Sequence, residues 1–333
     1  MKRFGSETAF QVARDSNKFQ DTRRGWAQSQ NLENLLYPSA RKYAHLSYFR
    51  QIESDTCGIK PSESAIEERI YGGSAAMPNS WPWVCLAETN VVSISLSFFF
   101  HIFQQVFYEE DIPCEDSDPS GSCTSNCGGS ILNSRYVLTA AHCINKKDPN
   151  KIIIKAGLHN SQSDDEQEPR RQVKKIRRII MHQGYNSETL ENDLVILELA
   201  DPLIFNDYVQ PVCLPDSDVK TNSLLVVLGW GDEKAGSNAL YLLKQSTATV
   251  MDACKNVDDY DKTKVFCIVD LTHKSSVCKG DSGGPALQKH GGRWVIEGVL
   301  SHGDDCKAEP GEYQNVFVRV FAYLPWINNI IDG

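Results

Sequence analysis

The sequence predicts an all-β protein that ends in one short helix. Short apolar runs rich in β-branched residues recur between turn-forming residues, which is typical of packed antiparallel strands. The C-terminal stretch differs, because apolar residues at 327, 330 and 331 beside Trp326 have helical spacing. Since 41% of the 333 residues are apolar, the chain can bury a sizeable core.

Charge and cysteine content narrow the functional classes. A net charge of −9 argues against nucleic acid as the main partner. Eleven cysteines, without the paired spacing of a zinc site, favour disulfides formed in an extracellular compartment. Residues 1–30 are polar and charged and contain no recognisable signal peptide, so we expect that the natural N-terminus lies upstream.

A glycine-rich stretch near the C-terminus, 278–285 (CKGDSGGP), has the composition of a catalytic turn. Glycine allows backbone angles that other residues resist, and it lets a substrate carbonyl approach the backbone closely. Ser282 is therefore a candidate nucleophile, and the N–H groups of Gly280 and Ser282 are candidate oxyanion donors. Such a turn usually has no catalytic role, so the assignment depends on a base and an orienting acid elsewhere.

The chain contains both of these groups. The segment TAAHC offers His142 as a base, and Asp193 stands at the start of an apolar strand. With Ser282, these motifs resemble the trypsin/chymotrypsin-like serine proteases from about residue 70 to the C-terminus. The resemblance implies two six-stranded antiparallel Greek-key β-barrels with the active site between them. It also implies hydrolysis of protein or peptide substrates through an acyl-enzyme, and protein inhibitors as partners.

The resemblance further implies a zymogen. The sequence around Arg69 and Ile70 resembles the family's activation junction, where cleavage frees an Ile70 amine that pairs with Asp281. Residues 1–69 are then a pro-segment, mostly disordered over 1–56, and residues 70–333 are the protease domain. An arginine before the cut implies a trypsin-like activating protease.

The family pattern breaks at an insertion of about residues 90–126. Its apolar part, 91–104, is too short to cross a membrane and includes His and Gln, so we expect no membrane span. We hypothesise that residues 92–104 are a translated intron, because Val-Ser can be encoded by a splice-donor-like hexamer and the Phe-rich end by a splice-acceptor-like run. The alternative is a genuine binding loop beside the active site.

The resemblance implies four disulfides: Cys57–Cys213, Cys127–Cys143, Cys254–Cys267 and Cys278–Cys306. Three cysteines then remain. Cys114 and Cys123 would pair within the insertion. Cys85 would be left free and core-facing, or paired with a lost cysteine.

Positions that match the family's primary pocket suggest the specificity. Ser276 matches the pocket base, where an Asp would select Lys or Arg, so the resemblance suggests cleavage after large apolar or aromatic residues. Ser301 and Gly303 match the wall that pairs with substrate backbone. His302 replaces the usual Trp there, which changes the shape of the wall and introduces a group that can carry charge.

The back of the pocket has two sequence candidates. If Asn315 rather than Gly311 occupies it, the pocket is shallower and more polar. Acidic residues within 304–312 could even favour basic substrates at the rim.

No cofactor or metal is expected. The acidic run 163–168 lies near a calcium loop of some relatives, but Leu158 occupies the position of an expected first carboxylate ligand, which favours a solvated charge run. The alternative function is a non-catalytic protease-like binding or regulatory protein. Such proteins usually lose a triad member or the glycine before Asp-Ser, and both are present here.

Overall fold

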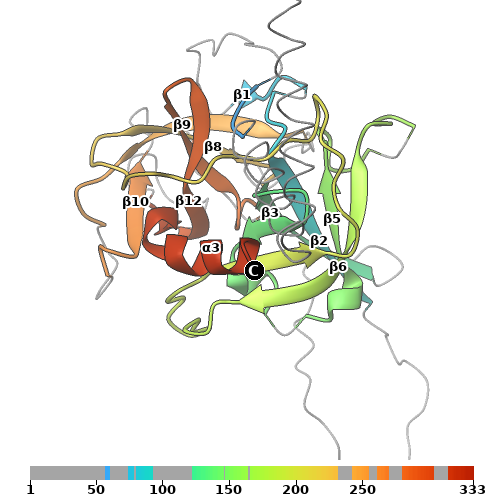
Figure 1. Cartoon of the computed structure of the whole chain (residues 1–333), viewed down its shortest axis with the longest axis horizontal. Helices are drawn as coiled ribbons and strands as arrows, with labels where there is room; N and C mark the ends of the chain where they lie inside the picture. The colour runs from blue at the N-terminus through green and yellow to red at the C-terminus, as the bar shows by residue number, and fades with distance from the viewer. Residues whose placement is uncertain are drawn as a thin grey trace, which may run out of the picture. The chain divides into compact units, whose positions relative to one another are not determined.

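A computed structural model describes most of the predicted protease domain and a short segment before it. The described residues are 57–60, 74–78, 80–92, 122–145, 147–163, 166–231, 242–254, 261–269, 280–303 and 314–333, with the side chains of 90–92 and 122–125 left out. Within them the predicted all-β class is confirmed, because two closed antiparallel barrels carry nearly all the regular structure (Figure 1).

The first barrel has the strand order β2-β3-β4-β7-β6-β5. Its strands are β2 (Val84–Val92), β3 (Ser122–Ile131), β4 (Tyr136–Thr139), β5 (Ile152–Ala156), β6 (Gln172–Met181) and β7 (Val195–Leu199). Alternate residues of β5 are fully buried, as expected for a strand with one face toward a core, whereas all five residues of β7 are buried. The strand that follows Asp193 therefore lies entirely inside the molecule.

The second barrel has the order β9-β10-β13-β12-β11-β8, and pairing of β8 with β9 closes it. Its strands are β8 (Leu224–Gly229), β9 (Lys244–Val250), β10 (Val265–Val269), β11 (Pro285–His290), β12 (Arg293–Gly303) and β13 (Asn315–Arg319). The short strand β1 (Ser74–Ala75) adds to the edge of β9. Gly291 and Gly292, both at positive φ, make the tight turn between β11 and β12.

Short helices complete the fold: η1 (Ala141–Cys143), η2 (Pro149–Lys151), η3 (Val320–Tyr323) and α3 (Leu324–Ile331). The expected C-terminal helix is thus present. Tyr323 and Trp326 pack edge-on against the ring of His182, with centroids 5.2 Å and 5.1 Å away. His182 directly follows β6, so the C-terminal segment contacts the first barrel as well as following the second. Among the described residues, no helix has the length and apolar character needed to cross a membrane.

The flanks of the insertion extend an existing hairpin. Strands β2 and β3 stay in register from Val84 opposite Ser130 to Val92 opposite Ser122. Continuous pairing therefore reaches into the insertion from both sides. Residues 93–121, and with them Cys114 and nearly all of the hypothesised intron, lie outside the described residues.

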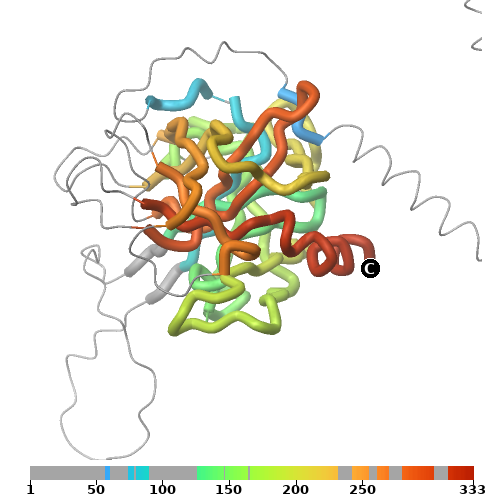
Figure 2. The backbone as a smooth tube through the Cα atoms, turned by 90° about the vertical axis from the view of Figure 1, so that its left-hand side faces the viewer, coloured from blue at the N-terminus to red at the C-terminus, as the bar shows by residue number. Residues whose placement is uncertain are grey.

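The segment 57–60 is attached to the second barrel. A disulfide joins Cys57 to Cys213, and Gly58 bonds through its N–H to Pro211 O (2.9 Å) and through its carbonyl to Trp294 N (2.9 Å). Figure 2 shows this blue segment beside the hairpin of β11 and β12. Gly58 has a φ of +65°, and a β-carbon there would lie 2.3 Å from Trp294 O, so only glycine fits this docked conformation.

Candidate active site

Two neighbouring strands of the first barrel bring the candidate base and acid together. His142 lies in η1, three residues beyond the end of β4, and Asp193 lies two residues before β7. Because β4 and β7 pair with Thr139 opposite Val195, these two ends are adjacent. His142 donates its backbone N–H to Asp193 Oδ1 (2.8 Å), and its Nδ1 lies 2.7 Å from Asp193 Oδ2. The carboxylate therefore holds the imidazole with its proton on Nδ1, which leaves Nε2 to act as a base.

The second barrel supplies another hydrogen bond to the same carboxylate. Ser301 on β12 donates its hydroxyl to Asp193 Oδ2 at 2.6 Å. Asp193 has no exposed surface, so its charge is stabilised by three hydrogen bonds rather than by water. The sequence assigned Ser301 only to the pocket wall, because a contact between residues 108 positions apart leaves no local signal.

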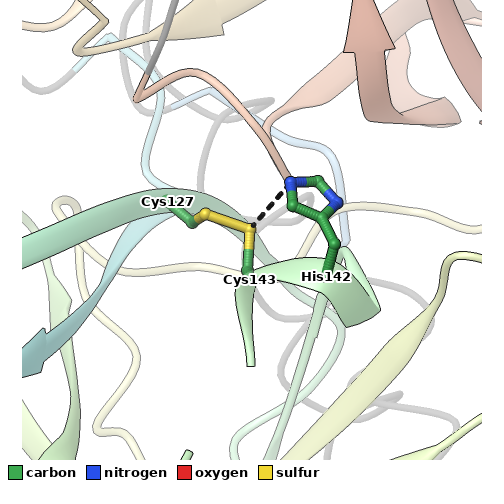
Figure 3. A group of neighbouring side chains, drawn as sticks. All are labelled: Cys127, His142 and Cys143. Atoms are coloured by element: carbon green, nitrogen blue, oxygen red, sulfur yellow. Dashed lines mark hydrogen bonds between the residues drawn. A yellow bond between two sulfur atoms is a disulfide. The ribbon is translucent and has the colours of Figure 1, made fainter. Parts of the chain in front are cut away.

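A disulfide borders the imidazole. Cys127 is bonded to Cys143, and Cys143 Sγ lies 3.7 Å from His142 Nε2 (Figure 3). The sulfurs and the ring lie within 4.8 Å of one another, as the ligands of a metal ion would. Because the sulfurs are bonded to each other, they are not available as thiolate ligands, and this donor set does not fit a zinc ion.

The turn that carries Ser282 is packed between the barrels. Gly128 donates its N–H to Ser282 O (2.8 Å), and Gly283 donates its N–H to Leu300 O (2.8 Å). Gly283 has a φ of +77°, and a β-carbon there would lie 2.1 Å from Thr139 Oγ1. The turn thus rests directly on the strand that leads to His142, and this close approach requires glycine.

The backbone around Ser282 leaves two donors available. Gly280 has a φ of +99°. No hydrogen bond among the described residues uses the N–H groups of Gly280 and Ser282, and the Ser282 hydroxyl does not bond to His142 there. Catalytic hydrogen bonds are often long without substrate. Within the described part of the chain, the turn therefore presents a half-buried serine and two backbone donors that make no hydrogen bond.

Asp281 is held in a site made by two glycines. Asp281 is buried, and its Oδ1 accepts the N–H of Gly231 at 2.6 Å. A β-carbon at Gly229 or Gly231 would lie 1.8 Å or 2.4 Å from the carboxylate oxygens. The Gly-Trp-Gly motif therefore makes room for this acid, which sequence reasoning had not connected with it. Arg69 and Ile70 lie outside the described residues, so their pairing with Asp281 stays a prediction.

The predicted pocket wall lies on β12 and β13. Gly303 pairs with Asn315, and a bulge between Leu300 and His302 contains Ser301. Asn315 is buried, and a β-carbon on Gly303 would lie 2.2 Å from Asn315 Oδ1. The Asn315 side chain thus lies directly against Gly303. Ser276, Gly311 and the loop 304–312 fall outside the described part of the chain, as does the expected Cys278–Cys306 bond.

One positioning contact was missed by sequence reasoning. Asn192, directly before Asp193, has a φ of +52°, a left-handed conformation that Asn tolerates better than most residues. Its Oδ1 accepts the hydroxyl of Tyr323 (2.9 Å), and its Nδ2 donates to Gly184 O (2.7 Å). The C-terminal segment thereby holds the residue that precedes the acid. An Asn directly before the acid was the only sequence signal.

The acidic loop is closed by protein groups. Glu168 accepts the N–H of His159 at 3.0 Å and 2.8 Å through its two oxygens, and the N–H of Asn160 at 2.6 Å. Leu158 is buried, and Asp164 and Asp165 lie outside the described residues. Calcium needs six or more oxygen ligands. The described donors of this loop do not fit that ion, and we derive no role for it.

Comparison with known proteins identifies the family. The family model described as Trypsin matches residues 113–327. The chain is 30% identical over 293 residues to "Serine protease filzig" of Drosophila melanogaster, covering 83% of this chain and 15% of that protein. It is 28% identical over 282 residues to "Transmembrane protease serine 7" of Mus musculus, covering 81% of this chain and 29% of that protein. The chain thus spans less than a third of either relative. The family match and the two closed barrels establish that this chain belongs to the trypsin-like serine protease family.

Proposed function

We propose that this chain is a serine endopeptidase that hydrolyses peptide bonds through an acyl-enzyme on Ser282. The observation that carries the proposal is the hydrogen-bonded pair His142–Asp193 together with a serine turn that packs on the end of β4, where the N–H groups of Gly280 and Ser282 make no hydrogen bond within the described residues. His142 Nε2 takes the hydroxyl proton as Ser282 attacks the carbonyl carbon, and later gives it to the leaving amine. Asp193 keeps the imidazole oriented and stabilises its charged form. The N–H groups of Gly280 and Ser282 bind the oxyanion.

Labelling by a fluorophosphonate, which reacts with activated serines whatever the substrate preference, tests this proposal. We expect the cleaved protein to be labelled at Ser282 and Ser282→Ala to be neither labelled nor active. The substitution keeps both backbone donors and His142 but removes the nucleophile, so no acyl-enzyme can form and the loss of activity will be nearly complete. Ser187→Ala, which changes an exposed serine elsewhere, is the matched control. Unchanged activity of Ser282→Ala would refute the assignment. Absence of labelling in correctly disulfide-bonded protein would favour a non-catalytic relative.

Activation by cleavage after Arg69 belongs to the same proposal. It is supported by the buried carboxylate of Asp281 and by the Cys57–Cys213 bond, which would keep residues 57–69 attached after the cut. We expect Arg69→Gln protein to resist a trypsin-like activator and to stay inactive, and Asp281→Asn to stay inactive even after cleavage. Full activity with the Arg69–Ile70 bond intact would contradict the zymogen proposal. The disulfides and the family together support an extracellular location.

The primary specificity is a proposal of its own. Ser276 and the open position at Gly303 favour large apolar or aromatic residues before the cut. The Asn315 side chain against Gly303 makes the pocket shallower and favours the smaller of them. A mixed peptide library cut by the activated protein reads this preference directly, and Asn315→Gly should extend cleavage to larger side chains. Cuts mainly after Lys or Arg would contradict the proposal and would implicate the acidic loop 304–312.

A further inference from the structure

Four side chains form one hydrogen-bonded chain that ends at the catalytic histidine. His302 Nδ1 lies 3.1 Å from Ser301 Oγ, and Ser301 Oγ lies 2.6 Å from Asp193 Oδ2. The same Oδ2 lies 2.7 Å from His142 Nδ1. His302 is the residue that stands where the family usually has Trp. A tryptophan has a single N–H donor, at Nε1, and no second ring nitrogen. The hydrogen bond from His302 to Ser301 is therefore a feature of this sequence rather than of the shared motifs.

The protons of this chain have only one consistent arrangement. A carboxylate can only accept, so Ser301 must use its single hydroxyl proton on Asp193. The Ser301 oxygen can then only accept from His302, which places a proton on His302 Nδ1. When His302 is neutral, its Nε2 is consequently an unprotonated acceptor. When it is charged, both nitrogens donate and the bond to Ser301 persists.

We propose that His302 is a positioning residue for the triad, whose Nδ1–H directs the Ser301 hydroxyl onto Asp193 and thereby tunes the basicity of His142. This inference rests on the proposed roles of His142 and Asp193. Ser301 lies in the bulge between Leu300 and His302, where the regular ladder is interrupted, and its side chain is buried. With the donor of His302 removed, the hydroxyl keeps its bond to Asp193 but loses the second partner that restricts its rotation. This row of hydrogen bonds thus links His302, in the wall of the substrate site, with the base His142.

Both possible charge states of His302 affect His142 in the same direction. A neutral His302 strengthens the hydrogen bond that Ser301 gives to Asp193, and a better-stabilised carboxylate attracts the imidazolium proton less. A charged His302 adds repulsion between two cations that share one carboxylate. On the neighbouring strand, His302 lies opposite Val316, which is apolar. Removing His302 therefore makes His142 hold its proton more tightly.

The test compares two substitutions that differ in one donor. His302→Asn keeps an N–H two bonds from the β-carbon, at the place of Nδ1, whereas His302→Phe keeps a ring and loses the donor. NMR of the full chain follows the titration of the His142 ring, which needs no turnover. We expect His302→Phe to move that titration to higher pH by roughly half a unit to one unit, and His302→Asn to remain closer to the wild type. His302→Leu provides a second donor-free variant, and thermal unfolding checks that each variant is folded.

A Ser301→Ala background decides whether His302 acts through Ser301. With the hydroxyl gone, the hydrogen-bonded path from His302 to Asp193 is broken, so any shift that remains comes from the charge of His302 and should be the same in His302→Phe and His302→Asn. In the activated enzyme, the acidic limb of the rate profile should move with the NMR titration, and kcat should change more than KM. Equal titrations in His302→Phe and wild type, or a difference between His302→Phe and His302→Asn that persists in the Ser301→Ala background, would overturn the inference. If the wild type fails to react with fluorophosphonate, the proposed function fails, while the NMR result still decides whether His302 positions Ser301.

Discussion

The packing of the nucleophile turn against the first barrel predicts a large effect of Gly283→Ala. The residue has a φ of +77°, where a side chain costs about 1–2 kcal/mol. The new β-carbon would lie 2.1 Å from Thr139 Oγ1 and 2.5 Å from Gly128 O. Both distances are well below 3.0 Å, the shortest separation that β-carbons normally show from non-bonded heavy atoms. The Thr139 hydroxyl has little freedom to move aside, because it donates to Gly128 O at 2.7 Å. The turn itself must shift.

That shift has a calculable cost. It would strain or break the bonds from Gly128 N to Ser282 O and from Gly283 N to Leu300 O, each worth about 1 kcal/mol net. Overpacking adds about 1–3 kcal/mol, and the positive φ adds about 1–2 kcal/mol, as given above. We therefore expect Gly283→Ala to lower the free energy of unfolding by about 4 kcal/mol or more. At about 2–4 °C per kcal/mol, the melting temperature should fall by about 8 °C or more.

Gly291→Ala is the matched control. Gly291 also has a positive φ, +55°, but a β-carbon there would meet no atom within 4 Å. The Gly291→Ala variant should lose only about 1–2 kcal/mol of stability, which is what a side chain costs at positive φ. It should keep the reactivity of Ser282 toward fluorophosphonate. Thermal unfolding of the two variants, with labelling of Ser282, isolates the steric contribution. Equal melting temperatures for the two variants, or full labelling of Gly283→Ala, would refute this account of the turn.

Three further predictions concern buried groups. Tyr323→Phe leaves Asn192 Oδ1 without its hydroxyl donor and should cost about 1–3 kcal/mol of stability, measured by denaturant unfolding, together with part of the activity through the neighbouring Asp193. Burial, assisted by nearby carboxylates, raises the pKa of Glu297 from 4.5 to about 7, so the folded state holds a proton that the unfolded chain releases. Wild-type stability should therefore fall relative to Glu297→Gln as the pH rises from about 4.5 to about 7 and stay lower above that, and parallel melting curves against pH would contradict this. Burial also raises the pKa of the Cys85 thiol, so iodoacetamide should modify Cys85 only after unfolding, as peptide mapping can check.

Local motifs were sufficient for the fold class and the candidate triad. His142, Asp193 and Ser282 each lie in a short motif whose residue types indicate a chemical role, and short apolar runs rich in β-branched residues predicted the packed strands. Two features were not predicted. The C-terminal segment contacts His182 at the end of β6, and the flanks of the insertion lengthen β2 and β3. Both depend on which surfaces meet in space, and sequence spacing does not encode that.

The residues that support the triad were visible only in three dimensions. Ser301 reaches Asp193 across 108 positions because one barrel contributes the acid and the other the hydroxyl. Gly231 reaches Asp281 across 50 positions because β8 and β11, the strands next to them, are paired within the second barrel. The sequence alone supplied the candidate nucleophile, base and acid, since their chemistry belongs to each side chain. The tertiary structure alone decided that Ser301 bonds to Asp193 and that Tyr323 bonds to Asn192, because these hydrogen bonds join residues more than 100 positions apart and form only when the two barrels pack against each other.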